Sequence, residues 1–319
     1  MKKKIKQFLR PVWRSSIVQK IRGCFFGISE KLLGYPRLKT DFKKRTGYKL
    51  DLKNPKSFNQ KICWKKVYDR NPLLPVVADK YRVRDYLRDF LGVKEAGKIL
   101  IPLLYVTNNP ETIPFDDLLE EYIIKANHGS GTNIIVEKDK PIDKNQIITQ
   151  CKEWLVQPYG LFKQEWAYQQ IDRKIVVEKL LRDKNGEIPK DYKFHMIHGE
   201  CVMIQVNQGH FWDKKNRRLT LFTKDWTKHK VFWEYPSAES VDCPKNLNSM
   251  LLLAEELSIP FDYVRIDLYS LEDGRIFFGE FTNYPTSGNA VVKPVSFDFD
   301  IGSKWKINSK YWGNEERHK

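Results

Sequence analysis

The sequence predicts an α+β fold, in which antiparallel strands and helices mix without the repeating strand–helix order of a doubly wound parallel sheet. Two segments lead to this prediction, residues 122–137 and residues 263–285, because each one shows two strands joined by a glycine-containing turn. Helical patterns precede, separate and follow them. With 319 residues and a hydrophobic content of 41%, the chain is large enough for one large or two medium domains.

The first segment carries a lysine on its leading strand and then a glycine-rich turn. Lys125 precedes Gly129, Ser130 and Gly131, which we call the glycine turn. Glycine accepts a positive φ, so the backbone N–H groups of such a turn can approach a phosphate closely, and Lys125 adds a compact positive charge. The pattern predicts a phosphate-binding turn. The alternative is a basic hairpin with an ordinary turn.

The second segment places two acidic residues on neighbouring strands. Asp267 and Glu280 lie on either side of a Glu-Asp-Gly turn and can stand side by side. Adjacent carboxylates repel unless a cation lies between them, and hard oxygen ligands suit Mg²⁺. Phe277, Phe278 and Phe281 indicate a partly buried setting. The alternative is a solvated sheet face with two outward acidic residues.

Periodicity and capping signals predict the other elements. One helix should begin after Ser57 and run through Tyr68, and a second should run from Val77 through Leu91 with Lys80 on its face. Further helices are expected over residues 143–157 and 246–257, and strands over residues 99–106, 122–125, 174–181, 192–198 and 200–207. Residues 208–240 have weak periodicity and receive no assignment.

The net charge of +16 is concentrated at one end of the chain. Residues 1–50 contain fifteen Lys or Arg and two acidic residues, a net charge of +13. In the same stretch, apolar residues recur at helical spacing: Ile5, Phe8, Leu9, Val12, Trp13, Ile17 and Ile21. This pattern is typical of a helix on an anionic membrane, so we expect residues 1–40 to contact such a surface. There are two alternatives: an arm that binds nucleic acid, which we favour less, and a solvated basic tail.

The cysteines and the hydropathy favour a cytoplasmic protein. The five cysteines are widely spaced without a CxxC pair, as is typical of reduced thiols. Charges interrupt every apolar run before the roughly 18 residues that a spanning helix needs, and no cleavable signal pattern follows the basic start. We expect a cytoplasmic location, with peripheral contact at the inner face of the cytoplasmic membrane.

Taken together, these features give the chain a resemblance to the ATP-grasp superfamily and, within it, to the TupA-like family of teichuronopeptide biosynthesis. The likeness runs from about Asp51 to Gly302. It rests on the order and spacing of short motifs: Pro55-Lys-Ser-Phe-Asn-Gln-Lys61, Ala78-Asp-Lys80-Tyr-Arg-Val-Arg84, Ile124-Lys125-Ala-Asn-His-Gly-Ser-Gly131, Val177-Glu178-Lys179-Leu180, Asp191-Tyr-Lys193-Phe and Arg265-Ile-Asp267 with Gly279-Glu280-Phe-Thr282. A Walker-type GxxxxGK[ST] motif is absent from the sequence.

The resemblance implies a nucleotide gripped between two α+β subdomains. Lys80 and Lys125 would bind the phosphates of ATP, and the glycine turn would close over them. Asp191 would hold the ribose. A strand edge made by three residues, Glu178, Lys179 and Leu180, would read adenine through backbone hydrogen bonds.

The resemblance also implies the residues of the chemical step. Lys193 and Arg265 would face the γ-phosphate and the charge that develops during its transfer, while Asp267 and Glu280 would hold Mg²⁺. Many ATP-grasp enzymes carry Asn two residues after the second acidic ligand, where this chain has Thr282. TupA-like sequences often carry Thr there, so we favour Thr282 as the third metal ligand over Asn283, which would need a bulge to reach the site.

The resemblance divides the chain into a basic arm (1–45), a helical region (46–110), an ATP-grasp region (111–302) and a basic tail (303–319). It implies an ATP- and Mg²⁺-dependent carboxylate–amine ligase. This enzyme would join an amino acid to a sugar acid or glycan acceptor. The product would belong to cell-surface polysaccharide biosynthesis of the teichuronopeptide, capsule or O-antigen type. The alternatives to a ligase are a phosphotransferase or a glycosyltransferase of envelope glycan assembly. A further alternative is a membrane- or nucleic-acid-binding module without catalysis.

Overall fold

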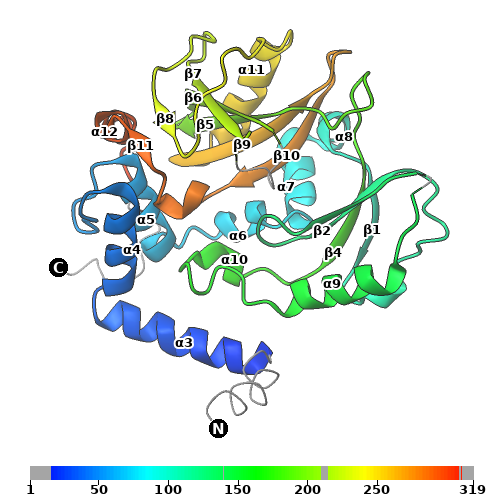
Figure 1. Cartoon of the computed structure of the whole chain (residues 1–319), viewed down its shortest axis with the longest axis horizontal. Helices are drawn as coiled ribbons and strands as arrows, with labels where there is room; N and C mark the ends of the chain where they lie inside the picture. The colour runs from blue at the N-terminus through cyan, green and yellow to red at the C-terminus, as the bar shows by residue number, and fades with distance from the viewer. Residues whose placement is uncertain (1–15, 139, 210–214, 309, 311–319) are drawn as a thin grey trace.

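The computed structural model describes residues 16–138, 140–209, 215–308 and 310 (Figure 1). Its main layers are two antiparallel sheets, one of four and one of five strands, with helices around them. This confirms the predicted α+β class. A minor two-stranded sheet pairs β8 (Phe232–Trp233) with β11 (Val292–Lys293).

The four-stranded sheet has the order β1-β4-β2-β3. Its strands are β1 (Leu103–Thr107), β2 (Tyr122–Ala126), β3 (Asn133–Val136) and β4 (Ile175–Lys179). Helix α9 (Lys144–Val156) covers one face, because Ile147, Cys151 and Trp154 pack with Tyr122 and Ile124 in one apolar cluster. The short helices η1 (Pro110–Thr112) and α10 (Trp166–Gln169) lie in the connections.

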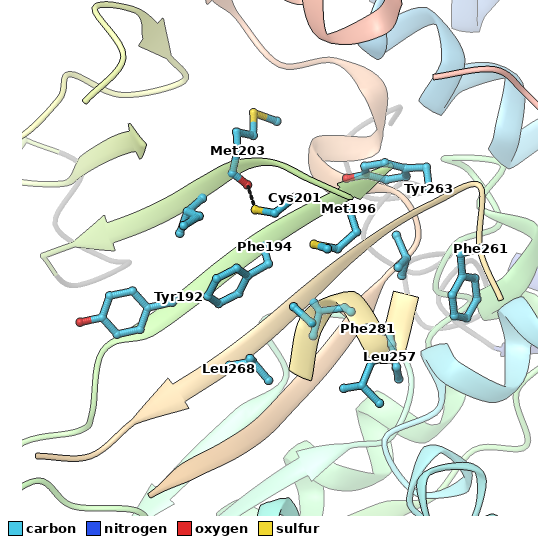
Figure 2. Close-up of a cluster of buried hydrophobic side chains, with 14 of the residues drawn as sticks. Tyr192, Phe194, Met196, Cys201, Met203, Leu257, Phe261, Tyr263, Leu268 and Phe281 are labelled. Atoms are coloured by element: carbon cyan, nitrogen blue, oxygen red, sulfur yellow. Dashed lines mark hydrogen bonds between the residues drawn. The ribbon is translucent and has the colours of Figure 1, made fainter. Parts of the chain in front are cut away.

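The five-stranded sheet has the order β10-β9-β5-β6-β7. Its strands are β5 (Asp191–Ile197), β6 (Glu200–Gln208), β7 (Arg218–Phe222), β9 (Tyr263–Ser270) and β10 (Ile276–Thr282). Figure 2 shows Phe194, Met196, Met203, Leu257 and Phe281 among the buried side chains of this sheet and of α11 (Leu247–Ser258), which packs on it. This apolar cluster is the largest among the described residues and supports the five-stranded sheet.

A β-bulge at Gly279 sets the register of the β9–β10 hairpin. Phe278 pairs with Leu268, but Glu280 pairs with Asp267, so one residue of β10 is skipped. A Cβ on Gly279 would lie 2.9 Å from the Asp267 carbonyl oxygen, which explains why a residue without a side chain stands here. The bulge brings the two acidic side chains directly opposite each other.

The described chain begins with a helical stretch, residues 16–99: α3 (Ser16–Leu32), α4 (Pro36–Thr46), α5 (Phe58–Tyr68), α6 (Leu73–Ala78), α7 (Arg82–Leu91) and α8 (Val93–Ile99). Near the other end lie η2 (Pro285–Gly288) and α12 (Val295–Ser303). The predicted start of α5 is confirmed, because Ser57 and Gln60 form a capping box there. The ring of Phe58 packs near those of His195, Trp233 and Tyr263, which anchors α5 to the five-stranded sheet.

Two predicted boundaries are wrong. The helix expected from Val77 through Leu91 is broken, because Asp79 Oδ1 accepts hydrogen bonds from the backbone N–H groups of Tyr81 and Arg82 and starts α7 afresh. Lys80 therefore lies in the turn between α6 and α7, not on a helix face. The strand expected from residue 99 begins only at Leu103, since α8 continues through residue 99.

The other assignments hold to within a few residues, namely the helices near 143–157 and 246–257 and the strands near 122, 174, 192 and 200. The apolar positions from Ile5 to Trp13 lie outside the described residues. In the part of the chain that is described, the longest helices are too short or too polar to cross a bilayer.

Candidate active site

A cleft lies between the two sheets and brings together the two segments that the sequence singled out. The four-stranded wall contributes Lys125 and the glycine turn, and the five-stranded wall contributes Asp191, Lys193, Asp267 and Glu280. Lys80 completes the lining from the α6–α7 turn. About 620 Å³ of the cleft is free of protein atoms, counting the solvent at its mouth.

The five-stranded wall carries a compact charged network. Arg265 grips Asp267 through two hydrogen bonds of 2.7 Å and also donates to Thr282 Oγ1 at 2.9 Å. Lys193 Nζ donates to Asp267 Oδ2 at 2.6 Å and also bonds Asp191. The side chains of Lys193, Arg265 and Asp267 are each about a tenth exposed or less. Such charge-assisted, two-pronged pairing fixes side-chain orientation as well as adding energy.

The pKa values of this network follow from burial and pairing. Burial disfavours the charged form of Asp267, but Arg265 and Lys193 outweigh it and hold the pKa of this carboxyl below its usual value. Burial also disfavours the Lys193 ammonium, yet Asp191 and Asp267 raise its pKa. Asp267 and Lys193 are therefore both charged at neutral pH.

Glu280 is held less tightly than Asp267. Its Oε1 lies 3.5 Å from the Arg265 guanidinium and accepts a hydrogen bond of 3.1 Å from the Thr282 hydroxyl, and its Oε2 lies 3.6 Å from Lys80 Nζ. The Glu280 side chain is 29% exposed, against 4% for Asp267. Asn283 points elsewhere, since its amide donates to the Leu74 carbonyl at 3.0 Å. The geometry thus brings Thr282, not Asn283, to the acidic pair.

Lys80 links the two walls. Its Nζ donates to the Gly129 carbonyl at 2.6 Å and lies within ion-pair distance of Glu280, and its backbone N–H donates to the Asn127 carbonyl. Lys125 Nζ instead bonds Glu178 Oε2 at 2.8 Å, and Glu178 also pairs with Arg84. Both lysines remain less than a fifth exposed at the cleft.

The glycine turn has the backbone that the sequence predicted, with φ of +82° at Gly129 and +75° at Gly131. Sequence reasoning missed its neighbour, Tyr159. The Tyr159 ring packs directly on Gly129, and its hydroxyl accepts the Ser130 backbone N–H at 3.2 Å. A lone tyrosine in a connection after a helix carries no pattern that would have revealed this contact.

The prediction that Glu178, Lys179 and Leu180 form a strand edge is wrong. β4 is an interior strand between β1 and β2, because two chain-distant strands pair with it at once. The backbone N–H groups of Lys179 and Leu180 donate to the Pro102 and Glu121 carbonyls. These two donors are engaged within the protein, and the buried Glu178 side chain bonds Lys125, which lines the cleft.

The oxygen donors on the five-stranded wall fit Mg²⁺. Asp267, Glu280 and Thr282 present two carboxylates and a hydroxyl on neighbouring strand positions. Within the described ranges no group of three or more His, Cys, Asp or Glu is placed to hold a metal ion by itself. Mg²⁺ is commonly bound by one or two carboxylates together with substrate phosphates, which matches this donor set.

The cleft lies between two antiparallel sheets, with Lys125 and the glycine turn on one side and the Asp267–Glu280 pair on the other. This arrangement is typical of the ATP-grasp class. The chain belongs to the TupA-like ATP-grasp family, whose model matches residues 60–306. This confirms both the fold and the family that the motifs predicted, and it agrees with the expectation of an ATP-grasp ligase.

Several solved structures resemble the chain at low identity. The D-alanine–D-alanine ligase of Bacillus anthracis is 16% identical over 72% of this chain and 65% of that chain, with a TM-score of 0.40. The ATP-grasp ligase PsnB with its minimal precursor is 13% identical over 68% and 55%, with a TM-score of 0.37. The ADP complex of purK, an N5-carboxyaminoimidazole ribonucleotide synthetase, is 10% identical over 66% and 45%, with a TM-score of 0.38.

The chain therefore spans less than two thirds of the length of these three structures. No curated protein matches the sequence.

Proposed function

We propose that this protein is an ATP- and Mg²⁺-dependent carboxylate–amine ligase. The observation that carries the proposal is that Lys80, the glycine turn and the Asp267–Glu280 pair line one cleft although they are far apart in the sequence. Phosphoryl transfer needs positioning and charge neutralisation more than covalent chemistry by the protein, and these are the groups that the cleft contains.

In the proposed reaction a carboxylate oxygen of the first substrate attacks the γ-phosphorus of ATP, and the bond to the bridging oxygen of ADP breaks. The amine of the second substrate then attacks the carbonyl carbon of the acyl phosphate. Inorganic phosphate leaves with the electron pair of the C–O bond, and the nitrogen loses a proton to complete the amide. No nucleophile from the protein is required.

The residues would divide this work between the walls. Lys80, Lys125 and the glycine turn would bind the phosphates, and Asp191 would bind the ribose. Asp267, Glu280 and Thr282 would hold Mg²⁺, which supplies charge neutralisation between the phosphates when bound. Lys193 and Arg265 would stabilise the charge that develops on the transferred phosphoryl group, since both are fixed in place by Asp267.

For the substrates, we propose an amino acid as the amine and a sugar acid or glycan acceptor as the carboxylate, in the biosynthesis of a cell-surface polysaccharide. The support for this choice is the resemblance of the motifs to the TupA-like family of teichuronopeptide biosynthesis. We also propose a cytoplasmic location, because the wide spacing of the cysteines is typical of reduced thiols. We further propose that the chain divides into four parts, with boundaries after residues 45, 110 and 302.

The test is product analysis. Purified protein with ATP, Mg²⁺ and a panel of uronic acids and amino acids should release ADP and phosphate only when both substrates of a productive pair are present. Hydroxylamine should trap the activated carboxylate as a hydroxamate. Release of AMP, or ADP formation without hydroxamate from any acid, would contradict the proposed chemistry and point to adenylation or to a phosphotransferase.

A further inference from the structure

Helix α3 exposes a row of large apolar side chains. Phe25, Ile28, Leu32 and the following Leu33 are 71%, 58%, 80% and 72% exposed. The first three recur at intervals of three and four residues and so lie on one side of the helix. Contiguous exposed apolar residues mark an interaction surface, whereas scattered single ones do not.

The opposite side of α3 is fastened to the body of the protein. A Cβ on Gly23 would overlap the Leu161 side chain, the rings of Phe26 and Phe162 lie 5.8 Å apart, and Glu30 accepts a hydrogen bond from Gln164. Figure 1 shows α3 along the outside of the molecule, away from both sheets. The apolar row therefore lies on the side of α3 that faces away from its contacts with Leu161, Phe162 and Gln164.

Positive charge surrounds this helix. Lys39, Lys43, Lys44 and Lys49 line a surface hollow on and beside α4, the next helix along the chain. Glu30 is buried and accepts backbone hydrogen bonds from Arg37 and Leu38 at the start of α4, which leaves Asp41 as the one exposed acidic side chain in residues 25–50. The sequence adds six basic and no acidic residues in positions 1–15.

We propose that α3 and α4 form a docking surface for an anionic lipid bilayer, with Phe25, Ile28 and Leu32 entering the headgroup layer and the α4 lysines contacting the lipid charges. The charge favours a bilayer over a protein partner. Protein–protein interfaces are depleted in lysine, while helices on membrane interfaces combine an apolar face with a lysine-rich one. The proposed ligase activity is not needed for this inference.

The test uses the full-length protein and flotation with vesicles, in the absence of ATP. Wild type should bind vesicles containing phosphatidylglycerol and bind pure phosphatidylcholine vesicles weakly. The triple variant Phe25→Ser, Ile28→Ser, Leu32→Ser should partition about tenfold or more weakly, because three apolar side chains no longer enter the interface. The variant Lys39→Gln, Lys43→Gln, Lys44→Gln should lose about fivefold per lysine in its affinity for the phosphatidylglycerol vesicles at low salt.

A matched control replaces three equally exposed apolar residues elsewhere. Val93→Ser, Leu252→Ser, Ile259→Ser removes side chains that are 73%, 68% and 70% exposed and should bind vesicles like wild type. Equal binding by the α3 variant and this control, or no binding by wild type, would overturn the proposal. A wild-type dimer in light scattering that the α3 variant abolishes would overturn it too, since a second copy would then be the partner. ADP release without vesicles should be the same in wild type and all three variants, so failure of the ligase proposal would be recognised separately.

Discussion

The two walls of the cleft hold their charges in different ways. On the five-stranded wall, Arg265, Lys193 and Asp267 are buried, bonded to one another and supported by the largest apolar cluster of the described chain. On the four-stranded wall, the glycine turn is a short loop whose position depends on Tyr159 and on Lys80. We infer that the first wall is the more rigid one and that the second, held by fewer contacts, is the more adjustable. The proposed chemistry would use both properties, because transition-state charge needs fixed partners and binding needs access.

The largest effect should come from Glu280, the more exposed carboxylate of the Asp267–Glu280 pair. Glu280→Gln should lower ADP release about 10³-fold, because the proposed metal site loses one of its two carboxylates. The melting temperature should change little, since Glu280 is 29% exposed and loosely held. Steady-state kinetics over a range of Mg²⁺ concentrations measures the first effect and thermal unfolding the second.

The control for this variant is Glu272→Gln, an exposed acidic residue in the turn of the same hairpin. It should keep full activity. If Glu280→Gln turns over within twofold of the wild-type rate, Glu280 is not a ligand of the metal site. The five-stranded wall would then differ less from the four-stranded wall in its role than we infer.

The next effect concerns the residue that joins the walls. Lys80→Met removes both the bond to the Gly129 carbonyl and the ion pair with Glu280, so we expect kcat/KM for ATP to fall about 100-fold, mainly through KM. The exposed Lys94→Met is the matched control. Should the loss appear in kcat with KM unchanged, Lys80 would act on the chemical step, and the four-stranded wall would not be primarily a binding element.

The rigid wall should also make stability depend on pH. His195 is fully buried in β5, where Nε2 faces Gln205 and Nδ1 faces the Tyr263 hydroxyl, and burial together with Arg265 lowers its pKa to about 3. A histidine in the unfolded chain has a pKa near 6.5, so the unfolded state takes up the proton first as pH falls. Stability from this residue is therefore present at pH 7 and declines as the pH falls below about 6.5.

Between pH 7 and pH 5 the expected loss from His195 is about 2 kcal/mol. Urea unfolding of His195→Gln should show a pH dependence shallower by that amount. His128 of the four-stranded wall, with a pKa lowered to about 4 by burial and by Arg173, contributes in the same direction and leaves a residual slope. Identical pH dependence in wild type and variant would mean that His195 already shares its environment with solvent.

The sequence could predict what local periodicity encodes and could not predict what distant pairing decides. Asp267 and Glu280 were recognisable because strand alternation and a Glu-Asp-Gly turn place them on one hairpin. The bulge at Gly279 that aligns them, however, depends on a close approach to the Asp267 carbonyl. Lys80 was found by its motif but placed on a helix, because the periodicity of residues 77–91 does not show the local hydrogen bonds by which Asp79 starts a new helix. The interior position of β4 follows from β1 and β2 pairing on both of its sides, and neither partner is adjacent to it in sequence.

The smallest effect separates two glycines of the adjustable wall. Both have positive φ, so alanine at either position carries a backbone cost of about 1 kcal/mol. At Gly131 a Cβ would meet no heavy atom within 4 Å, whereas at Gly129 it would lie 2.6 Å from the Tyr159 ring and would push that ring away from the turn. Gly129→Ala should therefore bind ATP about tenfold more weakly than Gly131→Ala, as measured by calorimetry, because only the first displaces Tyr159 as well as straining the backbone. If the two variants bind equally, contact with Tyr159 does not set the shape of the turn, and the adjustability of this wall resides in the glycine backbone alone.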